Sequence, residues 1–341
     1  MNTLLSAKQQ CQLSEAIEVT FGLDASLQDW TPMPGGQTTC QSFTNCINDQ
    51  YAVVARFLDP ATEASSRAQE RLCTQRASDM DVGAPLFYHD DHDTLLLMAH
   101  IKGTPLSRQH LSDTAVQVAV ASQIELWHQA FSDSIEPTPT ICQRIQKLET
   151  QTNSTILNLI GLGDLATKTR MWTQYIPSDT ILTPCHGDPN PSNMIQQSSG
   201  TVKLIDWSHA GLNDSLLDFA VLAQYIPENA LPKWHQVITG HVWQGDILQT
   251  LTAYQNLLYL HCALWALNEA QTCYHMQHEY GSEEAWLAIL RDEISPNVES
   301  IANIQNRWFN GQFNHNNYQE YLSLMQTMLN LSRQTKTVTY H

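Results

Sequence analysis

The chain has few basic residues and no long hydrophobic run. Its 17 lysines and arginines are set against 34 aspartates and glutamates, which gives a net charge of −17 over 341 residues. A field of this sign repels nucleic acid and anionic membranes, so we expect no polynucleotide partner, and it favours a cationic small molecule. The apolar stretch from Leu257 to Leu267 is interrupted by His261 and is too short to span a bilayer.

The chain also lacks paired cysteine motifs and an apolar leader. None of its eight cysteines forms a C-x-x-C pair, which favours free thiols over disulfides in a chain of this length. Cys185 precedes a histidine, and we expect it to be a buried thiol at the end of a strand rather than a nucleophile. Residues 1–16 have no apolar core of the kind found in signal peptides. We therefore expect a soluble, cytoplasmic protein without a membrane span, whose oligomeric state the sequence leaves open.

The strongest pattern lies in residues 181–219, which read ILTPCHGDPNPSNMIQQSSGTVKLIDWSHAGLNDSLLDF. Short apolar segments at 194–195 and 202–205 flank a Ser-Ser-Gly turn, which predicts a β-hairpin. Polar residues stand just before the first strand and just after the second. The hairpin therefore brings these polar groups to one end.

Three of these groups have the chemistry that phosphoryl transfer needs. Asp188 and Asn193 precede the hairpin, and Asp206 follows it. A kinase uses one aspartate to orient and accept the proton of the attacking hydroxyl, and an asparagine and a second aspartate to hold magnesium. Magnesium prefers a few hard oxygen ligands, because ATP phosphates and water supply the rest.

The motif H-G-D-x-x-x-x-N, followed by L-I-D-W-x-x-A-G-x-x-D-x-x-x-D-F-A, resembles the aminoglycoside phosphotransferase and choline kinase superfamily. The segment LIDWSHAGLNDSLLDFA is most similar to choline, ethanolamine and thiamine kinases. The resemblance implies that Asp188 is the base and that Asn193 and Asp206 are magnesium ligands. It also assigns a supporting structural role to three residues of the same segment: His186, Asp214 and Asp218.

Two positions depart from the family pattern. Pro189 replaces a usual apolar residue, and Ser208 stands where a glutamate is common. Neither departure changes the three groups that carry the chemistry.

The resemblance covers about residues 30–270 and implies an α+β, protein-kinase-like fold with two lobes. A small N-lobe with an antiparallel sheet is expected over residues 1–100. A larger and mainly helical C-lobe is expected over residues 101–341, and its polar tail, 311–341, carries no motif. ATP and Mg²⁺ are the implied cofactors.

One basic residue lies inside a predicted strand of the N-lobe. Residues 51–58 have the β-branched and aromatic density of a strand, and they include Arg56. A buried charge needs a partner. By the resemblance, Arg56 holds the ATP phosphates and pairs with a glutamate of the predicted helix 63–77, either Glu70 or its competitor Glu63. The alternative is a solvent-facing arginine on an edge strand.

Two further N-lobe segments are assigned to the nucleotide. Gly35 and Gly36 resemble the loop that covers the phosphates, where glycine lets backbone amides approach closely, although a plain turn is the alternative. The predicted strand 94–101 resembles the last strand and hinge of the N-lobe. Backbone groups between Met98 and His100 would then bind adenine, which leaves the choice between ATP and GTP open.

Helical patterns dominate the rest of the chain, at 115–131, 141–160 and 251–272. In the last of these, Leu264-Trp265 resembles an L-W pair on the helices that wall the choline kinase pocket. Trp265, Tyr259 and Trp286 are therefore candidates to bind an ammonium group through cation–π attraction, with core packing as the alternative.

The resemblance predicts phosphotransfer to the hydroxyl of a small, cationic substrate related to choline, ethanolamine or thiamine. An aminoglycoside 3′-type phosphotransferase is the second enzyme hypothesis. A nucleotide-binding pseudokinase without turnover is the hypothesis from another class, and the intact Asp188, Asn193 and Asp206 argue against it.

Overall fold

The computed structural model describes residues 5–23, 30–33, 40–48, 50–130, 132–240, 242–278, 281–293, 303–304, 307 and 313–334. The chain forms two compact units: Met1–Thr138 with Leu182–Ser215, and Pro139–Ile181 with Leu216–His341. The first unit thus contains Asp188, Asn193 and Asp206 together with the N-terminal sheet. The lobe boundary expected after residue 100 stays a prediction.

A five-stranded antiparallel sheet forms the N-terminal part of the first unit. Its strands follow the spatial order β1 (Thr31–Pro32), β2 (Gln41–Ile47), β3 (Tyr51–Phe57), β5 (Leu95–Ala99) and β4 (Leu86–His89). Every pairing is antiparallel. The predicted strands 51–58 and 94–101 are thus confirmed, and they are direct neighbours in the sheet.

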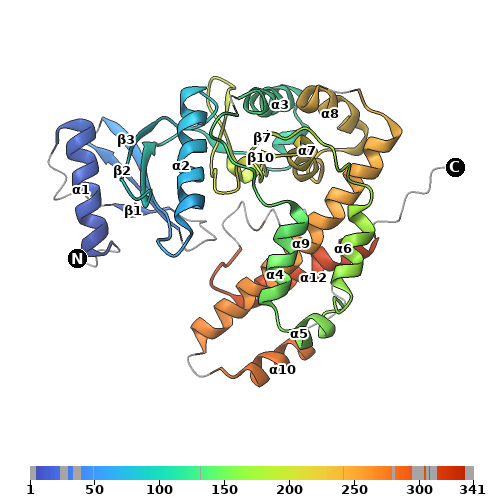
Figure 1. Ribbon diagram of the computed structural model, residues 1–341. Coiled ribbons are helices and arrows are strands. Elements are labelled where there is room, and N and C mark those ends of the chain that lie inside the picture. The colour runs from blue at the N-terminus through green and yellow to red at the C-terminus, as the bar shows by residue number, and fades with distance from the viewer. Residues whose placement is uncertain are drawn as a thin grey trace. The chain divides into compact units, whose positions relative to one another are not determined.

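The two faces of this sheet are covered by different helices (Figure 1). Helix α1 (Ala7–Phe21) packs Leu13 and Ile17 into one buried cluster with Ala55 and Phe57. Because side chains alternate along a strand, Arg56 faces the opposite side. That side carries α2 (Ala64–Asp79), which the sequence predicts at 63–77.

Local capping explains where α1 begins and ends. The Ser6 side chain accepts a hydrogen bond from the Gln9 backbone N–H, and the Gln9 side chain accepts one from the Ser6 backbone N–H, which forms a capping box. Gly22 ends the helix in the left-handed conformation, with φ of 68°.

The remaining strands of the first unit form two small sheets. One has the order β6 (Thr104–Pro105), β8 (Met194–Gln196) and β9 (Val202–Leu204); the other pairs β7 (Thr183–Cys185) with β10 (Gly211–Asn213). The helical segments of this part are η1 (His110–Ser112), α3 (Thr114–His128) and η2 (Pro191–Asn193). The antiparallel pairing of β8 with β9 confirms the predicted hairpin.

The second unit is helical among its described residues. Its elements are α4 (Ile141–Gln151), α5 (Ser154–Leu159), α6 (Leu165–Thr173), η3 (Glu228–Ala230), α8 (Leu231–Thr239), α9 (Gly245–Gln277), α10 (Glu283–Glu293), α12 (Tyr318–Gln334) and all but the first residue of α7 (Ser215–Ala223). The expected continuous helix 141–160 is wrong in one respect. It breaks after Gln151, because Asn153 starts a new helix by accepting a hydrogen bond from the Thr155 backbone at 2.8 Å.

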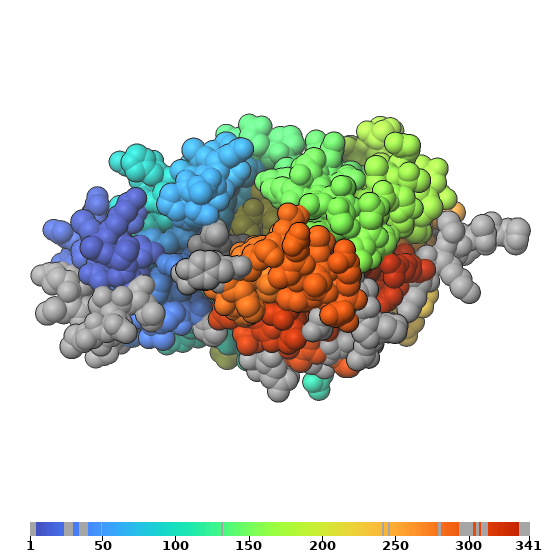
Figure 2. Space-filling model, turned by 90° about the horizontal axis from the view of Figure 1, so that it is seen from below, coloured from blue at the N-terminus to red at the C-terminus, as the bar shows by residue number. Residues whose placement is uncertain are grey.

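The 33-residue helix α9 is the central element of this unit. Helix α12 packs along it, so that the orange and red parts of the chain lie side by side (Figure 1 and Figure 2). Helices α4 and α6 pack on α9 as well. Part of the tail for which the sequence offered no motif is therefore an integral helix of this unit.

Two sequence expectations concern the chain as a whole. All eight cysteines are free thiols, as expected. Among the described residues, each helix is too short or too polar to cross a lipid bilayer.

Candidate active site

The loop before the hairpin holds the Asp188 side chain through two asparagines. Asn193 Nδ2 donates to the Asp188 carbonyl oxygen at 3.0 Å and to Asp188 Oδ2 at 3.3 Å. Asn190 Nδ2 donates to the same Oδ2 at 3.1 Å. The sequence motif identified Asn193 but not Asn190, although asparagine directly before a proline and a serine is a common turn and cap signal.

The metal-ligand candidates lie on adjoining backbone. Ile205 donates its N–H to the carbonyl oxygen of Asn193 at 2.9 Å, which ties Asn193 to the residue before Asp206. Because Asn193 turns its Nδ2 toward oxygen acceptors, its Oδ1 is directed elsewhere, and that oxygen has no partner among the described residues. An amide oxygen and a carboxylate, carried by residues on adjoining backbone, are donors of the kind that Mg²⁺ prefers.

Asp206 adopts an uncommon backbone conformation. Its φ is 63°, in the left-handed region that aspartate and asparagine tolerate better than most residues. This turn follows β9 at once and directs the carboxylate toward Arg56, whose Nη2 donates to Asp206 Oδ1 at 2.9 Å. The side chain of Asp206 is 37% exposed.

Arg56 bridges two carboxylates. Its Nε donates to Glu70 Oε1 at 2.8 Å, and its Nη2 holds Asp206. Of the two glutamates that the sequence offered as partners, Glu70 makes the ion pair, while Glu63 is the exposed N-cap residue of α2. The alternative of a solvent-facing arginine is wrong, because the Arg56 side chain is only 14% exposed.

Burial and charge act in opposite directions on these groups. Burial raises the pKa of Asp206, but the Arg56 charge, a Ser208 hydrogen bond and His209 outweigh it, so the pKa lies below its usual value. Burial also raises the pKa of Glu70, and there it outweighs the opposing effect of Arg56. For Arg56, the two carboxylates more than compensate for burial and raise its pKa. The Asp206 carboxylate is therefore ionised at neutral pH and can bind a cation.

His186, the histidine of the H-G-D motif, connects the loop to the segment after β9. His186 is fully buried, and its Nε2 lies 2.9 Å from the carbonyl oxygen of Ile205. Its ring centroid lies 4.7 Å from that of Trp207, which in turn packs at 4.5 Å against Trp127 of α3. The supporting role assigned to His186 stays a prediction.

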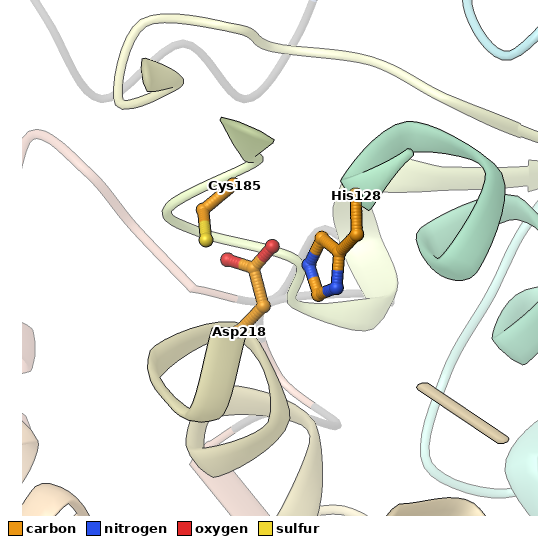
Figure 3. A group of neighbouring side chains, drawn as sticks. All are labelled: His128, Cys185 and Asp218. Atoms are coloured by element: carbon orange, nitrogen blue, oxygen red, sulfur yellow. The ribbon is translucent and has the colours of Figure 1, made fainter. Parts of the chain in front are cut away.

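Cys185, the last residue of β7, and His128, the last residue of α3, belong to the first unit (Figure 3). The Cys185 side chain is fully buried at the end of β7, and its thiol donates to the carbonyl oxygen of Asn213 at 3.5 Å. The expectation of a buried strand-end thiol is confirmed. Asp214 follows β10 and is buried; Asp218, also labelled in Figure 3, is buried in the first turn of α7 and belongs to the second unit. Their assignment as supporting residues stays a prediction.

The residues assigned to the nucleotide are only partly described. Gly35 and Gly36 lie outside the described residues. Met98 lies within β5, opposite both Val54 and Leu86, and the His100 N–H donates to the Ala52 carbonyl oxygen at 2.9 Å. Hydrogen bonds between strands thus occupy many of the backbone groups that were expected to bind adenine.

The acceptor candidates all belong to the second unit. Trp265 is half-buried on α9, with its ring edge-on to Tyr321 of α12 at 5.7 Å. Tyr259 is half-buried, whereas Trp286 is fully buried and its ring centroid lies 5.2 Å from that of Tyr274. The packing alternative therefore describes Trp286 better than a role in binding.

Sequence reasoning missed a carboxylate beside Trp265. Glu269 follows Trp265 by one helical turn. Burial, and secondarily the charge of Glu269, raise the pKa of Tyr321, which places Glu269 near that ring. Burial raises the pKa of Glu269, and no cation pairs with it among the described residues. The spacing of four residues between Trp265 and Glu269, within a predicted helix, was the sequence signal that could have identified this carboxylate.

The sequence profile described as choline/ethanolamine kinase matches residues 48–235. The chain belongs to the choline/ethanolamine kinase family. The matched range includes β3 with Arg56 and the whole loop and hairpin segment. This is a family of small-molecule kinases.

Individual relatives support the same fold. Protein LicA of Haemophilus influenzae is 45% identical over 51 residues, which is 15% of this chain and 15% of that protein's length. The crystal structure of a choline/ethanolamine kinase family protein from Mesorhizobium loti covers 93% of this chain and 98% of its own, with a TM-score of 0.58 and 14% identity. A spectinomycin phosphotransferase in complex with ADP and spectinomycin covers 95% and 99%, with a TM-score of 0.56 and 12% identity. The protein-kinase-like α+β fold is thereby confirmed.

Proposed function

We propose that this protein transfers the γ-phosphoryl group of ATP, with Mg²⁺, to the hydroxyl of a small cationic alcohol of the choline or ethanolamine type. The observation that carries the proposal is the hydrogen-bonded loop in which Asn193 holds Asp188 and adjoins the residue before Asp206. Family membership supports the same reaction class.

In the proposed mechanism, Asp188 orients the acceptor hydroxyl and accepts its proton. Asn193 Oδ1 and the Asp206 carboxylate would hold Mg²⁺, which would neutralise phosphate charge when bound. Arg56 keeps Asp206 in place, and its Nη1, which has no partner among the described residues, is available for a phosphate oxygen. Catalysis is then mainly positioning and charge neutralisation.

We propose that Gly35 and Gly36 cover the nucleotide and that the end of β5 binds adenine, as the resemblance implies. The His100 amide already donates to Ala52. The Ile101 amide, which has no partner among the described residues, is therefore the better backbone donor for the base.

Asp188→Asn tests the reaction. The change keeps the shape of the side chain but removes the proton acceptor, so we expect kcat to fall about 10²- to 10⁴-fold while ATP binding is retained. The assay is Mg²⁺-dependent ADP release with choline, ethanolamine, thiamine and kanamycin as acceptors. Chelation of Mg²⁺ should abolish the signal. A wild-type protein that binds ATP but transfers phosphate to none of these acceptors would favour the pseudokinase.

The acceptor class rests on residues of the second unit. We propose that Glu269 and the ring of Trp265 bind the cationic group, because an unpaired, half-buried carboxylate one helical turn from a half-buried aromatic ring suits an ammonium ion. An excess of 17 negative charges also attracts cations. An aminoglycoside is the second candidate acceptor, supported by the fold that this chain shares with a spectinomycin phosphotransferase.

Glu269→Gln tests the acceptor class. Loss of the charge should raise the KM for a cationic acceptor about tenfold, equivalent to about 1.4 kcal/mol, and leave the KM for ATP unchanged. Glu284→Gln is the control, since Glu284 is exposed on α10 of the same unit. Equal acceptor KM values in wild type and Glu269→Gln would remove Glu269 from the binding of the cation.

A further inference from the structure

The loop that carries Asp188 contains a second asparagine to which the proposed function gives no task. Asn190 stands between two prolines, in the sequence Asp188-Pro189-Asn190-Pro191. Pro189 is also the position at which this chain departs from the usual family pattern. Both features concern how the loop is held.

The prolines restrict the backbone of Asn190. A residue before proline is pushed into the extended region, and Asn190 has φ of −72° and ψ of 155°. Its N–H donates to the Asp188 carbonyl oxygen at 2.8 Å, and its own carbonyl oxygen accepts from Asn193 N–H at 2.9 Å. The position of the Asn190 Cα is therefore fixed relative to Asp188 before any side-chain contact is considered.

The side chain of Asn190 is oriented from its oxygen end. The Ser192 backbone N–H lies 2.9 Å from Asn190 Oδ1, and the Ser192 hydroxyl donates to the same atom. A backbone N–H can only donate, so this end of the carboxamide must be the oxygen. The NH₂ end is consequently turned toward Asp188 Oδ2, at 3.1 Å.

The result is an unequal environment for the two oxygens of Asp188. Oδ2 receives N–H donors from Asn190 and Asn193, at 3.1 and 3.3 Å. Oδ1 receives none from the described residues. The torsion that turns a carboxylate is broad and roughly two-fold, so without such donors the two oxygens could exchange places.

We propose that Asn190 is a positioning residue that locks the rotation of the Asp188 carboxylate, so that Oδ1 is the oxygen that meets the acceptor hydroxyl. In this step the hydroxyl proton passes to Oδ1 and the hydroxyl oxygen forms the new bond to phosphorus. The bond from the γ-phosphorus to the bridging oxygen breaks, and its electron pair leaves with ADP. This inference rests on the phosphotransfer proposed above.

Asn190→Asp separates positioning from capping. Aspartate caps a helical turn as well as asparagine does, so the contact with Ser192 and the turn of η2 are retained. The donor to Asp188 is replaced by a second carboxylate oxygen, which repels Oδ2. We expect kcat to fall about 10- to 100-fold, since small misplacement of a reacting group has effects of that size, with unchanged KM for ATP and unchanged thermal midpoint.

Asn153→Asp is a matched control. Asn153 also caps a helix through its oxygen, with Thr155 N–H at 2.8 Å, and also donates from Nδ2 to a carboxylate, Glu283 Oε1, at 2.6 Å. The same substitution there should leave kcat at the wild-type level. Asn190→Ala should lower kcat as Asn190→Asp does and also lower the thermal midpoint, because it removes the cap.

A kcat for Asn190→Asp equal to that of wild type would overturn the proposal and leave the phosphotransfer function intact. Wild-type protein without turnover would instead overturn the phosphotransfer function. The crystal structure of Asn190→Asp then still tests the positioning role, because it needs no turnover. The Asp188 carboxylate should be rotated away from its wild-type orientation; an unchanged orientation would overturn the proposal.

Discussion

Single side chains of the site are held by partners that are far apart in sequence. Arg56 joins Glu70 of α2 to Asp206, which lies 150 residues further along the chain. The motif spacing predicted Asp188, Asn193 and Asp206, because these three lie on one local hairpin. The bridge to Asp206 could not be predicted, since it depends on how β3 and the hairpin pack.

The role of Asn190 was not predictable for a different reason. The orientation of a carboxamide is decided by its neighbours, here by the Ser192 N–H at one end and Asp188 at the other. The sequence shows that an asparagine is present, but it does not show which end faces the carboxylate.

A buried thiol makes stability depend on alkaline pH. Burial, and secondarily the nearby Glu70 carboxylate, raise the pKa of Cys73 from 9.0 to about 12. The unfolded chain loses this proton near its ordinary pKa while the folded chain keeps it. The stabilisation is therefore complete below pH 9 and is lost progressively as the pH rises from 9 toward 12.

Urea unfolding of wild type and Cys73→Ala between pH 8 and 11 measures this effect. Once the pH exceeds the unfolded pKa, the wild-type free energy of unfolding should fall by about 1.4 kcal/mol more per pH unit than that of the variant. Parallel pH profiles would contradict the prediction. The exposed Cys11 offers a control, Cys11→Ala, which should follow the wild-type curve.

The turn before Asp188 has little tolerance for a side chain. Gly187 has φ of 80°, and a Cβ there would lie 2.2 Å from the His209 carbonyl oxygen. Gly200, in the β8–β9 turn, has a similar φ of 88° but open space around it. Both glycines adopt a left-handed backbone, but only Gly187 lacks space for a Cβ atom.

Gly187→Ala should therefore be more damaging than Gly200→Ala. The shared left-handed backbone costs each variant about 1 kcal/mol, and the clash adds to this only at Gly187. We expect Gly187→Ala to lose both stability and most of its kcat, and Gly200→Ala to retain near-normal kcat. Thermal unfolding and steady-state kinetics of the two variants provide the measurement. Equal losses in both would show that the loop can move away from His209.

The elements themselves were largely predictable from periodicity, with one informative failure. Helix α12 lies in the C-terminal part of the chain that the sequence predicts to be helical, and Tyr321, Leu322, Met325 and Leu329 form its buried stripe. The break between α4 and α5 was missed because the apolar period continues across the cap at Asn153.

On the scale of the whole molecule, the chain crosses between its units three times. The crossings follow Thr138, Ile181 and Ser215. At the second crossing Ile181 is 84% exposed and Leu182 47% exposed, between a turn and the start of β7. Local sequence patterns gave no signal of this interleaving, because they carry no information on contacts between distant segments.

Thermolysin, which cuts before large apolar residues, should cleave near Ile181 and Leu182, since exposed segments without regular structure are cut preferentially. The two fragments should stay together under native conditions. Residues 104–105 remain paired with 194–196 in the first unit, and α4 remains packed on α9 in the second. Size-exclusion chromatography followed by denaturing gel electrophoresis tests both points. Separation of the fragments without denaturant would contradict the prediction.

The interleaved order of the two units also determines when each unit can fold during synthesis on the ribosome. The first unit is complete in sequence once residue 215 has emerged, whereas α4 must wait for α9, which ends at Gln277. Until then Ile141 and Ile145, both buried in the finished protein, have no long helix to pack against. The nascent chain thus carries an uncovered apolar stripe through the synthesis of more than a hundred residues, and this interval is when a chaperone would be of most use.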